Sequence, residues 1–210
     1  ARLVQDRLNF AKTEEVTPQE LVNSRNFSSA IKDFFARSPY SQLVDQTNPL
    51  AELTHKRRLT AIGEGVFSER KRIGFEVRDV HYTHYGRICP IETPEGGNIG
   101  ILTSLATYAR VDKLGFLRSP YRVVKNGVVK DEIKYLSADE EDNYRIAPAS
   151  TQLDKNGKII EKEVLVRYRG IFPKFPVGKV DFIDVSARQV VSVSTSLVPF
   201  LEHDDANRAL

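Results

Sequence analysis

The spacing of apolar positions predicts helices near the start of the chain. Between Asn26 and Arg37 the apolar residues recur at helical spacing, at Phe27, Ile31, Phe34 and Phe35. Pro39 follows and cannot continue a helix. Two further helix starts combine a capping side chain with a proline in the first turn, at Thr17-Pro18 and at Asn48-Pro49. We therefore expect the chain to begin with helices joined by short loops.

From about Phe116 to Val185 the pattern changes to that of strands. Asn126-Gly127 lies between pairs of β-branched residues, which is the strongest short-range signal for a β-hairpin. Asn156-Gly157 suggests a second hairpin, which would continue into Val164–Tyr168. We expect this part to be chiefly antiparallel β, with no helix of three or more turns.

The sequence also predicts secondary structure for two segments that flank this β-rich part. Ile99–Arg110 follows the turn Glu92–Asn98 and is expected to form a helix, whereas Val190–Val193 is a candidate strand that leads into Phe200–Leu210. The whole pattern predicts the α+β class. A region of mixed helices and loops up to about Leu105 would precede a small antiparallel β-rich module.

Composition narrows the class of protein. A chain of 210 residues suggests one large or two small domains, and its 40% of hydrophobic residues can form cores. We expect no membrane partner, because no apolar run is long enough to cross a bilayer and the first residues do not form a signal peptide. The single cysteine, Cys89, cannot form an internal disulfide and fits a reducing compartment.

Positive charge is concentrated in one region. The net charge of the chain is +3, but His55–Pro90 alone contains eight Lys or Arg against four acidic residues. Within it, three consecutive cations, Lys56-Arg57-Arg58, end a short helix close to the glycines of Gly63-Glu64-Gly65. Such a surface favours contact with a phosphate backbone. The alternatives are a solvated helix end or a localisation signal.

Two small clusters contain residue types that bind metals. They are His81, His84 and Cys89, and Glu202, Asp204 and Asp205. The first has zinc-type ligands, but it lacks the second pair of a zinc motif, and its cysteine fits a buried position better. The second could hold a cation, or one of its aspartates could cap a following helix. We favour the structural interpretation of both and predict no metal site in this chain.

Three long motifs resemble the β subunit of bacterial-type multisubunit DNA-directed RNA polymerase. They are DQTNPLAELTHKRRL (Asp45–Leu59), VRDVHYTHYGRICPIETPEG (Val77–Gly96) and FLEHDDANRAL (Phe200–Leu210). The resemblance extends from about Thr17 to the last residue and weakens between about Asp139 and Asp181. Because the family's subunit is several times longer, the resemblance implies an internal piece of a chain that continues past Leu210.

The resemblance implies four parts. Residues 1–27 would be the end of the lobe region and a linker, and 28–105 the fork region with the fork loop and the rifampicin pocket. Residues 106–188 would be an external β-rich module, and 189–210 the start of the hybrid-binding domain. Together they would position template DNA, the RNA–DNA hybrid and the incoming nucleotide.

The family is a nucleotidyltransferase that acts only as an assembled complex, so the isolated chain is expected to be inactive. Implied partners are the β′, α and ω subunits, a sigma factor, the DNA template, nascent RNA and ribonucleoside triphosphates. Mg²⁺ would be held mainly by β′. The location would be the cytoplasm at the nucleoid, or an organelle for a plastid-type enzyme. A stand-alone nucleic-acid-binding module and a metal-dependent nuclease are the alternative functions.

Three sets of site residues follow from the matched motifs. Residues assigned to the nucleotide are Glu95, Asp205, Asn207 and Arg208. Those assigned to nucleic acid are Lys56, Arg57, Arg58, Arg70, Lys71 and Arg72. The antibiotic pocket would consist of Gln42, Leu43, Asp45, His55, Arg58, Thr60, Pro94, Asn98 and Leu102.

The chain departs from the family pattern at three places. Leu43 stands where Phe is usual, and Thr60 stands where Ser is usual, so sensitivity to rifampicin is left open. The loop Gly63–Gly74 begins Gly-Glu-Gly-Val instead of Gly-Pro-Gly-Gly and is one residue longer. The contacts of its basic residues therefore do not transfer one by one from the family.

Overall fold

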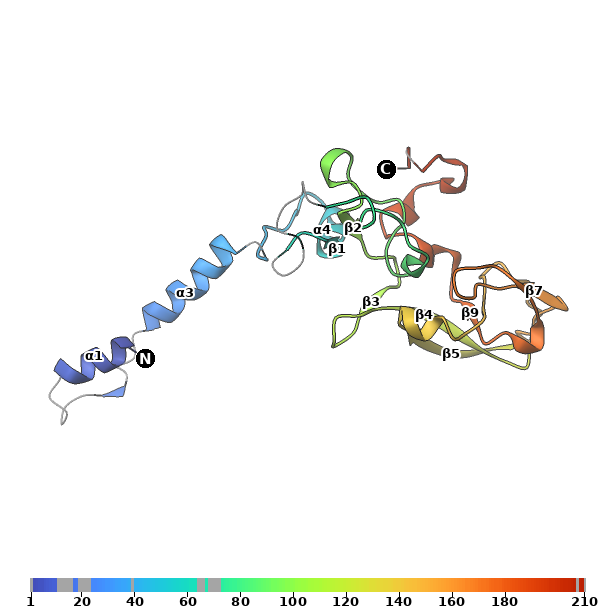
Figure 1. Ribbon diagram of the computed structural model, residues 1–210, viewed down its shortest axis with the longest axis horizontal. Coiled ribbons are helices and arrows are strands. Elements are labelled where there is room, and N and C mark those ends of the chain that lie inside the picture. The colour runs from blue at the N-terminus through green and yellow to red at the C-terminus, as the bar shows by residue number, and fades with distance from the viewer. Residues whose placement is uncertain are drawn as a thin grey trace. The chain divides into compact units, whose positions relative to one another are not determined.

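The helical beginning of the chain and the remainder form separate units. The computed structural model describes residues 2–10, 17–18, 24–38, 40–63, 67, 73–206 and 208–209, which divide into units 1–44 and 45–210 (Figure 1). The first unit contains α1 (Arg2–Phe10) and α3 (Ser24–Arg37). The predicted helix at Asn26–Arg37 is therefore confirmed, and its apolar residues are exposed. Of the helix predicted to start at Thr17-Pro18, the residues that follow Pro18, 19–23, lie outside the described residues.

The second unit begins with the short helix α4 (Pro49–Lys56). Asn48 caps it as predicted, because the side-chain oxygen of Asn48 accepts a hydrogen bond of 2.8 Å from the backbone N–H of Ala51. The chain then enters β1 (Arg58–Thr60), which pairs antiparallel with β2 (Leu102–Ser104). This pairing joins the two ends of a long, loop-rich segment.

The helix predicted at Ile99–Arg110 is wrong. The segment forms β2 and then a turn into β3 (Arg110–Val111). Gly100 has a φ of +70°, which a right-handed helix cannot contain. The apolar residues that suggested a helix, Leu105, Ala106 and Ala109, pack instead as a small buried cluster.

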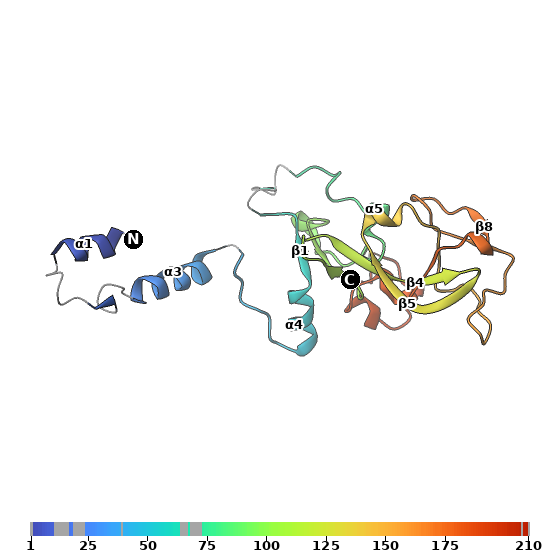
Figure 2. The same ribbon diagram turned by 90° about the horizontal axis from the view of Figure 1, so that it is seen from below.

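The following module is built on a long hairpin. Strands β4 (Leu117–Lys125) and β5 (Val128–Leu136) run side by side as a twisted pair (Figures 1 and 2). Asn126 and Gly127 join them with φ values of 52° and 75°, the left-handed backbone that a tight hairpin turn requires. The first predicted hairpin is confirmed.

The other strands of the module are short. Strand β4 also pairs with β3 and with β9 (Phe182–Asp184), and β9 pairs in parallel with β6 (Ile146–Ala147). A separate antiparallel pair is formed by β7 (Glu163–Leu165) and β8 (Lys174–Pro176). The single α-helix among the described residues of the module is the one-turn α5 (Ala138–Glu141). The module is therefore chiefly antiparallel β, and the α+β class is confirmed.

Two finer predictions in this part need correction. Asn156-Gly157 does form a turn, closed by a bridge between Leu153 and Ile159, but the segment that would have continued the hairpin pairs with β8 instead. Val190–Val193 is not a strand. Val190 ends the 3-10 turn η5 (Ala187–Val190), which Ser186 caps and in which Gln189 accepts from the backbone N–H of Val185, and Ser192 forms an isolated bridge with Ala106. The remaining 3-10 turns are η2 (Tyr82–His84), η3 (Gly96–Asn98), η4 (Val177–Lys179), η6 (Thr195–Leu197) and η7 (Leu201–His203).

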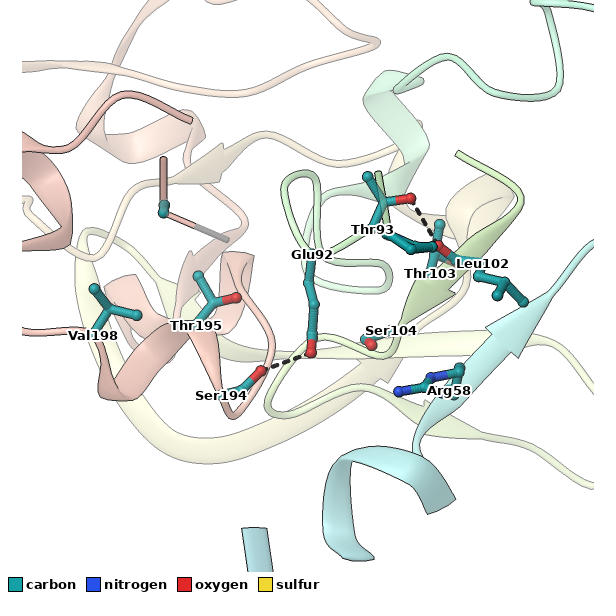
Figure 3. A pocket seen from close by; sticks show the side chains of 11 residues that line it. Arg58, Glu92, Thr93, Leu102, Thr103, Ser104, Ser194, Thr195 and Val198 are labelled. Carbon is teal, nitrogen blue, oxygen red and sulfur yellow. Dashed lines mark hydrogen bonds between the residues drawn. The ribbon is translucent and has the colours of Figure 1, made fainter. Parts of the chain in front are cut away.

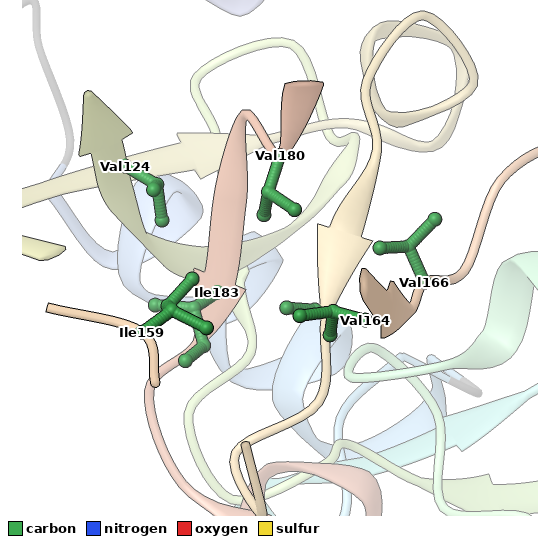
Figure 4. Close-up of a cluster of buried hydrophobic side chains, with 7 residues drawn as sticks. Val124, Ile159, Val164, Val166, Val180 and Ile183 are labelled. Atoms are coloured by element: carbon green, nitrogen blue, oxygen red, sulfur yellow. The ribbon is translucent and has the colours of Figure 1, made fainter. Parts of the chain in front are cut away.

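The central strand β9 of the module is buried on both faces. Adjacent residues on a strand point to opposite faces, and Phe182 and Ile183 of β9 accordingly belong to different buried clusters. The first cluster consists of Val124, Ala147, Ile159, Val164, Val166, Val180 and Ile183 (Figure 4). The second consists of Tyr121, Val123, Leu136, Ile146 and Phe182. Within the described ranges, no helix is long and apolar enough to cross a membrane.

A buried ionic cluster joins the loop-rich segment to the module. The Glu141 carboxylate accepts hydrogen bonds from Arg87 at 2.6 Å, Arg167 at 3.0 Å and the Tyr121 hydroxyl at 2.9 Å. The guanidinium of Arg167 also lies 3.5 Å from the centre of the Tyr85 ring. Tyr85 and Arg87 follow η2 in the loop-rich segment, whereas Glu141, Arg167 and Tyr121 belong to the module. The cluster therefore fixes the loop-rich segment to the module.

Replacing Glu141 by Ala is expected to lower the free energy of unfolding by about 3–5 kcal/mol, because two buried guanidinium groups would lose their shared carboxylate. Urea unfolding of the chain measures this loss. Glu132→Ala, an exposed change on β5, is the control and should cost less than about 0.5 kcal/mol. Equal losses for the two variants would show that the cluster does not hold the segments together.

The same cluster makes stability sensitive to alkaline pH. Burial, and then the charge of a neighbouring carboxylate, raise the pKa of the Tyr85 and Tyr121 hydroxyls. Their contribution to stability is therefore fully present below about pH 10, where unfolded tyrosines ionise, and is lost as pH rises toward the folded pKa values. The free energy of unfolding should fall by about 1.4 kcal/mol per pH unit for each tyrosine.

Urea unfolding between about pH 10 and 12 checks this fall. Tyr85→Phe should have a shallower pH dependence than the unchanged chain, whatever its loss of stability at neutral pH. Tyr108→Phe, a change at an exposed tyrosine, should leave the slope unaltered. A slope that is the same in all three would contradict the assignment.

Candidate functional site

The three consecutive cations at the end of α4 have different surroundings. Lys56 pairs with Glu52 one turn earlier, with 2.6 Å between Nζ and Oε1. Arg57 donates from Nη2 to three backbone carbonyl oxygens, those of Ala106 (2.6 Å), Thr107 (3.3 Å) and Ala109 (3.4 Å). Its burial lowers the pKa of the guanidinium. Arg57 thus holds α4 to the segment before β3, which the charge pattern alone did not indicate.

Arg58 differs from its neighbour because it lines a cavity. The cavity has a volume of about 430 Å³ and lies against β1, β2, the turn at Glu92–Pro94 and η6 (Figure 3). Three residues of the predicted antibiotic pocket line it together: Arg58, Pro94 and Leu102. The β1–β2 register explains part of this arrangement, since Arg58 lies directly opposite Ser104, another residue of the cavity wall.

Glu92 is the acidic group of this cavity. Its Oε1 accepts a hydrogen bond of 2.7 Å from the Ser194 hydroxyl (Figure 3). The other carboxylate oxygen is buried and has no hydrogen-bond partner among the described residues. The cavity therefore combines a cation, a carboxylate and hydroxyl groups with the apolar side chains of Leu102 and Val198. It can accept a ligand that is largely apolar and carries a few polar groups.

Sequence reasoning missed the part that Glu92 and Ser194 play here. Glu92 was considered only as a member of a turn, and Ser194 was not singled out. The two residues are 102 positions apart, and a contact over that separation leaves no local pattern. A long-range pairing of this kind becomes visible only in the folded chain.

Asp45 and His55 are brought together at the start and end of α4. The backbone N–H of Asp45 donates to Nδ1 of His55 at 3.0 Å, so this ring nitrogen is the unprotonated one. The Asp45 carboxylate accepts from the hydroxyl (2.7 Å) and backbone N–H (3.0 Å) of Thr47. These hydrogen bonds, and then the charge of Arg58, lower the pKa of Asp45. Gln42 and Leu43 belong to the first unit.

The loop that carries Glu95 and Asn98 is closed by Thr93. The Thr93 hydroxyl donates to the carbonyl of Leu102 at 2.9 Å and accepts from the N–H of Gly100 at 2.8 Å. Glu95 is exposed, whereas Asn98 is half-buried. The side-chain oxygen of Asn98 is buried without a hydrogen-bond partner in the described part of the chain. This oxygen can accept a hydrogen bond from a bound molecule.

The C-terminal motif forms turns instead of a regular helix. Phe200, in the left-handed conformation at a φ of 58°, precedes η7. The carbonyl of Asp205 accepts from the N–H groups of Arg208 (2.8 Å) and Ala209 (3.0 Å), so a turn begins at Asp205. Ala209 lies at the wall of the cavity. Asn207 is outside the described residues, as are Arg70, Lys71 and Arg72.

The two candidate metal clusters do not converge in the described ranges. No group of three or more His, Cys, Asp or Glu side chains there is placed to hold a metal ion. Cys89 is buried, with 3% of its surface exposed, and the His81 ring contacts the hydroxyl of Thr83 at 2.8 Å. Glu202 lies 3.9 Å from its neighbour His203 at the exposed end of the chain.

Comparison with known proteins decides the family. Residues 42–111 match the family described as RNA polymerase Rpb2, domain 3, and residues 121–186 match the RNA polymerase beta subunit external 1 domain. These two ranges include most of the chain. The DNA-directed RNA polymerase subunit beta of Pseudothermotoga lettingae is 58% identical to it over 210 residues. The chain belongs to the β-subunit family of DNA-directed RNA polymerases.

Two further β subunits show the same degree of similarity. Those of Acetivibrio thermocellus and Clostridium perfringens are each 57% identical, over 212 and 211 residues. All of this chain is aligned in each comparison, but only 18%, 17% and 17% of the three relatives. The chain thus spans less than a fifth of the length of these β subunits. The domain 3 match contains α4, β1, β2 and the Glu92–Pro94 turn, and the external 1 match contains most of the β-rich module.

Proposed function

We propose that this chain is the part of an RNA polymerase β subunit that positions template DNA, the RNA–DNA hybrid and the incoming nucleotide. The observation that carries the proposal is the identity of 57–58% to β subunits over the whole chain. The geometry supports it, because the end of α4 and the cavity walls at Arg58, Glu92–Pro94 and Leu102–Ser104 lie within the domain 3 match. In the cell the chain would act in the cytoplasm, at the nucleoid.

The reaction of the assembled enzyme would be the addition of a ribonucleotide to the 3′ end of RNA on a DNA template. Its partners would be the β′, α and ω subunits and a sigma factor. Mg²⁺ would supply charge neutralisation for in-line phosphoryl transfer. As the family resemblance implies, its ligands would come mainly from β′, and no metal ligand is assigned to the described residues of this chain. The contribution of this chain is to bind and orient the substrates.

Arg208 is proposed to contact the β- or γ-phosphate of the incoming nucleotide. A guanidinium suits this task, since its planar donors match phosphate oxygens. The turn that begins at Asp205 places the Arg208 backbone, and Asn207 and Glu95 would lie on the same side of the active centre. The rival assignment is a structural salt bridge from Arg208 to Glu202 or Asp205.

The assembled polymerase with Arg208→Ala in its β subunit should use nucleotide less well. Losing a charge-assisted hydrogen bond to the triphosphate costs about 1.5–3 kcal/mol, which would appear in kcat/KM for the nucleotide while hybrid affinity is unchanged. Steady-state incorporation and a separate hybrid-binding titration measure the two quantities. An Arg208→Ala enzyme that assembles poorly but then uses nucleotide normally would favour the salt bridge.

The cavity beside Arg58 is proposed to be part of a rifampicin-type antibiotic pocket. Arg58, Pro94 and Leu102 line it, and the contact between Asp45 and His55 fixes two more residues of the predicted set. An ansamycin is large and mostly apolar with a few hydroxyl groups, which fits a wall of mixed chemistry. Compared with the family pattern, Leu43 removes an aromatic face and Thr60 adds a methyl group to a hydroxyl side chain.

The basic residues of the fork region are proposed to face nucleic acid. Arg58→Ala should reduce the slope of log affinity against log salt by roughly one, because one phosphate contact is lost. Arg57→Ala provides the comparison, since its three carbonyl contacts give it a structural role as well. Filter binding of the assembled enzyme to a nucleic-acid scaffold at several salt concentrations gives both slopes. Unchanged slopes in both variants would reject the assignment.

A further inference from the structure

Arg78 fastens the loop that carries Glu95 and Asn98. Its Nη1 donates to two backbone carbonyl oxygens of that loop, those of Gly97 at 3.0 Å and Ile99 at 2.7 Å. A single charged donor group therefore bridges two carbonyls that are two residues apart. Hydrogen bonds from a charged donor are stronger than those between neutral groups.

A second contact brings the backbone of the same loop against Arg78. Gly100 has a φ of +70°, and a Cβ atom at this position would lie 2.4 Å from the Arg78 carbonyl oxygen and 2.6 Å from its Cα. Real Cβ atoms do not approach backbone so closely, so only glycine allows this contact. The loop is thus held to Arg78 by both the side chain and the main chain.

The loop is also closed internally. The Thr93 hydroxyl bridges the N–H of Gly100 and the carbonyl of Leu102, and the N–H of Ile101 donates to the carbonyl of Asn98 at 3.0 Å. These contacts fix the conformation of the loop, whereas Arg78 fixes its position against the turn at Phe75–Arg78. Without Arg78, the loop would lose its anchor, and its internal hydrogen bonds, which include those of the Ile99 and Ile101 amides, would open more often.

We propose that Arg78 is a positioning residue for nucleotide addition, which acts by holding Glu95 and Asn98 in place. The inference rests on the proposed function, because it concerns the loop assigned to the active-centre side. It also separates Arg78 from Arg58, with which charge counting groups it. Because Nη1 of Arg78 is held by two backbone carbonyls, we assign Arg78 to the loop and not to a phosphate.

The test uses the assembled polymerase that contains the full β subunit. Arg78→Ala should raise KM for the incoming nucleotide about tenfold, with a smaller change in kcat. This is the order expected when the displaced loop loses one hydrogen bond to a charged group of the nucleotide. Arg78→Lys should restore part of this loss, because an ammonium can reach one carbonyl but lacks the planar fork. The salt slope of nucleic-acid binding should stay as in the unchanged enzyme.

Gly100→Ala tests the same contact without removing a charge. It forces the loop away from the Arg78 backbone, so it should raise KM in the same way. The matched controls are Gly178→Ala, where an added Cβ meets nothing within 4 Å, and Arg188→Ala at an exposed arginine. Neither control should change KM.

Hydrogen exchange supplies a readout apart from activity. In the assembled enzyme, the amides of Ile99 and Ile101 should exchange faster in both Arg78→Ala and Gly100→Ala than in the unchanged protein. Unchanged KM and exchange in these variants would overturn the proposal, and so would a reduced salt slope in Arg78→Ala. If Arg78→Ala does not assemble, Gly100→Ala decides alone. If the enzyme without substitutions did not incorporate nucleotide, the proposed function would be contradicted instead. Hydrogen exchange would then still test whether Arg78 anchors the loop.

Discussion

Hydrogen bonds from arginine to backbone carbonyls hold the loop-rich part of this chain together. Between α4 and β3 few of the described residues lie in regular strands or helices, so many of their carbonyl oxygens lack a partner in a ladder. Arg57, Arg78 and Arg87 supply donors to at least two such oxygens each. Arg87 additionally reaches the carbonyls of Leu117, the first residue of β4, and Leu136, the last residue of β5. In this segment the guanidinium groups donate to backbone carbonyls that neighbouring strands would satisfy in a sheet.

This arrangement changes the meaning of the positive charge in the sequence. The eight basic residues of His55–Pro90 suggested one continuous surface for nucleic acid. In the folded chain three of them bind backbone carbonyls, and Lys56 pairs with Glu52. A count of charges cannot separate an arginine that faces solvent from one that holds a loop, because both have the same side chain. The difference lies in which carbonyls are near.

Elements with a local cause were predictable from the sequence. The Asn48 cap and the Asn126-Gly127 turn depend on two to four adjacent residues, and both occur where expected. The failure at Ile99–Arg110 has the opposite cause, because β2 exists only through its pairing with β1 more than forty residues earlier. Short apolar runs are ambiguous between helix and strand until such a partner is known.

The candidate site was predicted by long motifs and not by local chemistry. The motifs gathered Arg58, Pro94 and Leu102 into one set, and the fold places these three around one cavity. They gave no indication of the Glu92–Ser194 hydrogen bond, which closes the opposite wall. That bond forms because the chain, after the module, comes back to the loop-rich segment. There Ser192–Thr195 packs beside the turn at Cys89.

The lone cysteine lies at this return point and gives the chain a chemical reporter. Its thiol is 3.8 Å from the Thr195 hydroxyl and is almost completely covered. An alkylating reagent can reach it only when the residues around it move apart, and these include Thr195 and the Glu92 backbone at the wall of the cavity. The rate of thiol modification would therefore record how often the wall of the cavity opens, without any label having to be introduced.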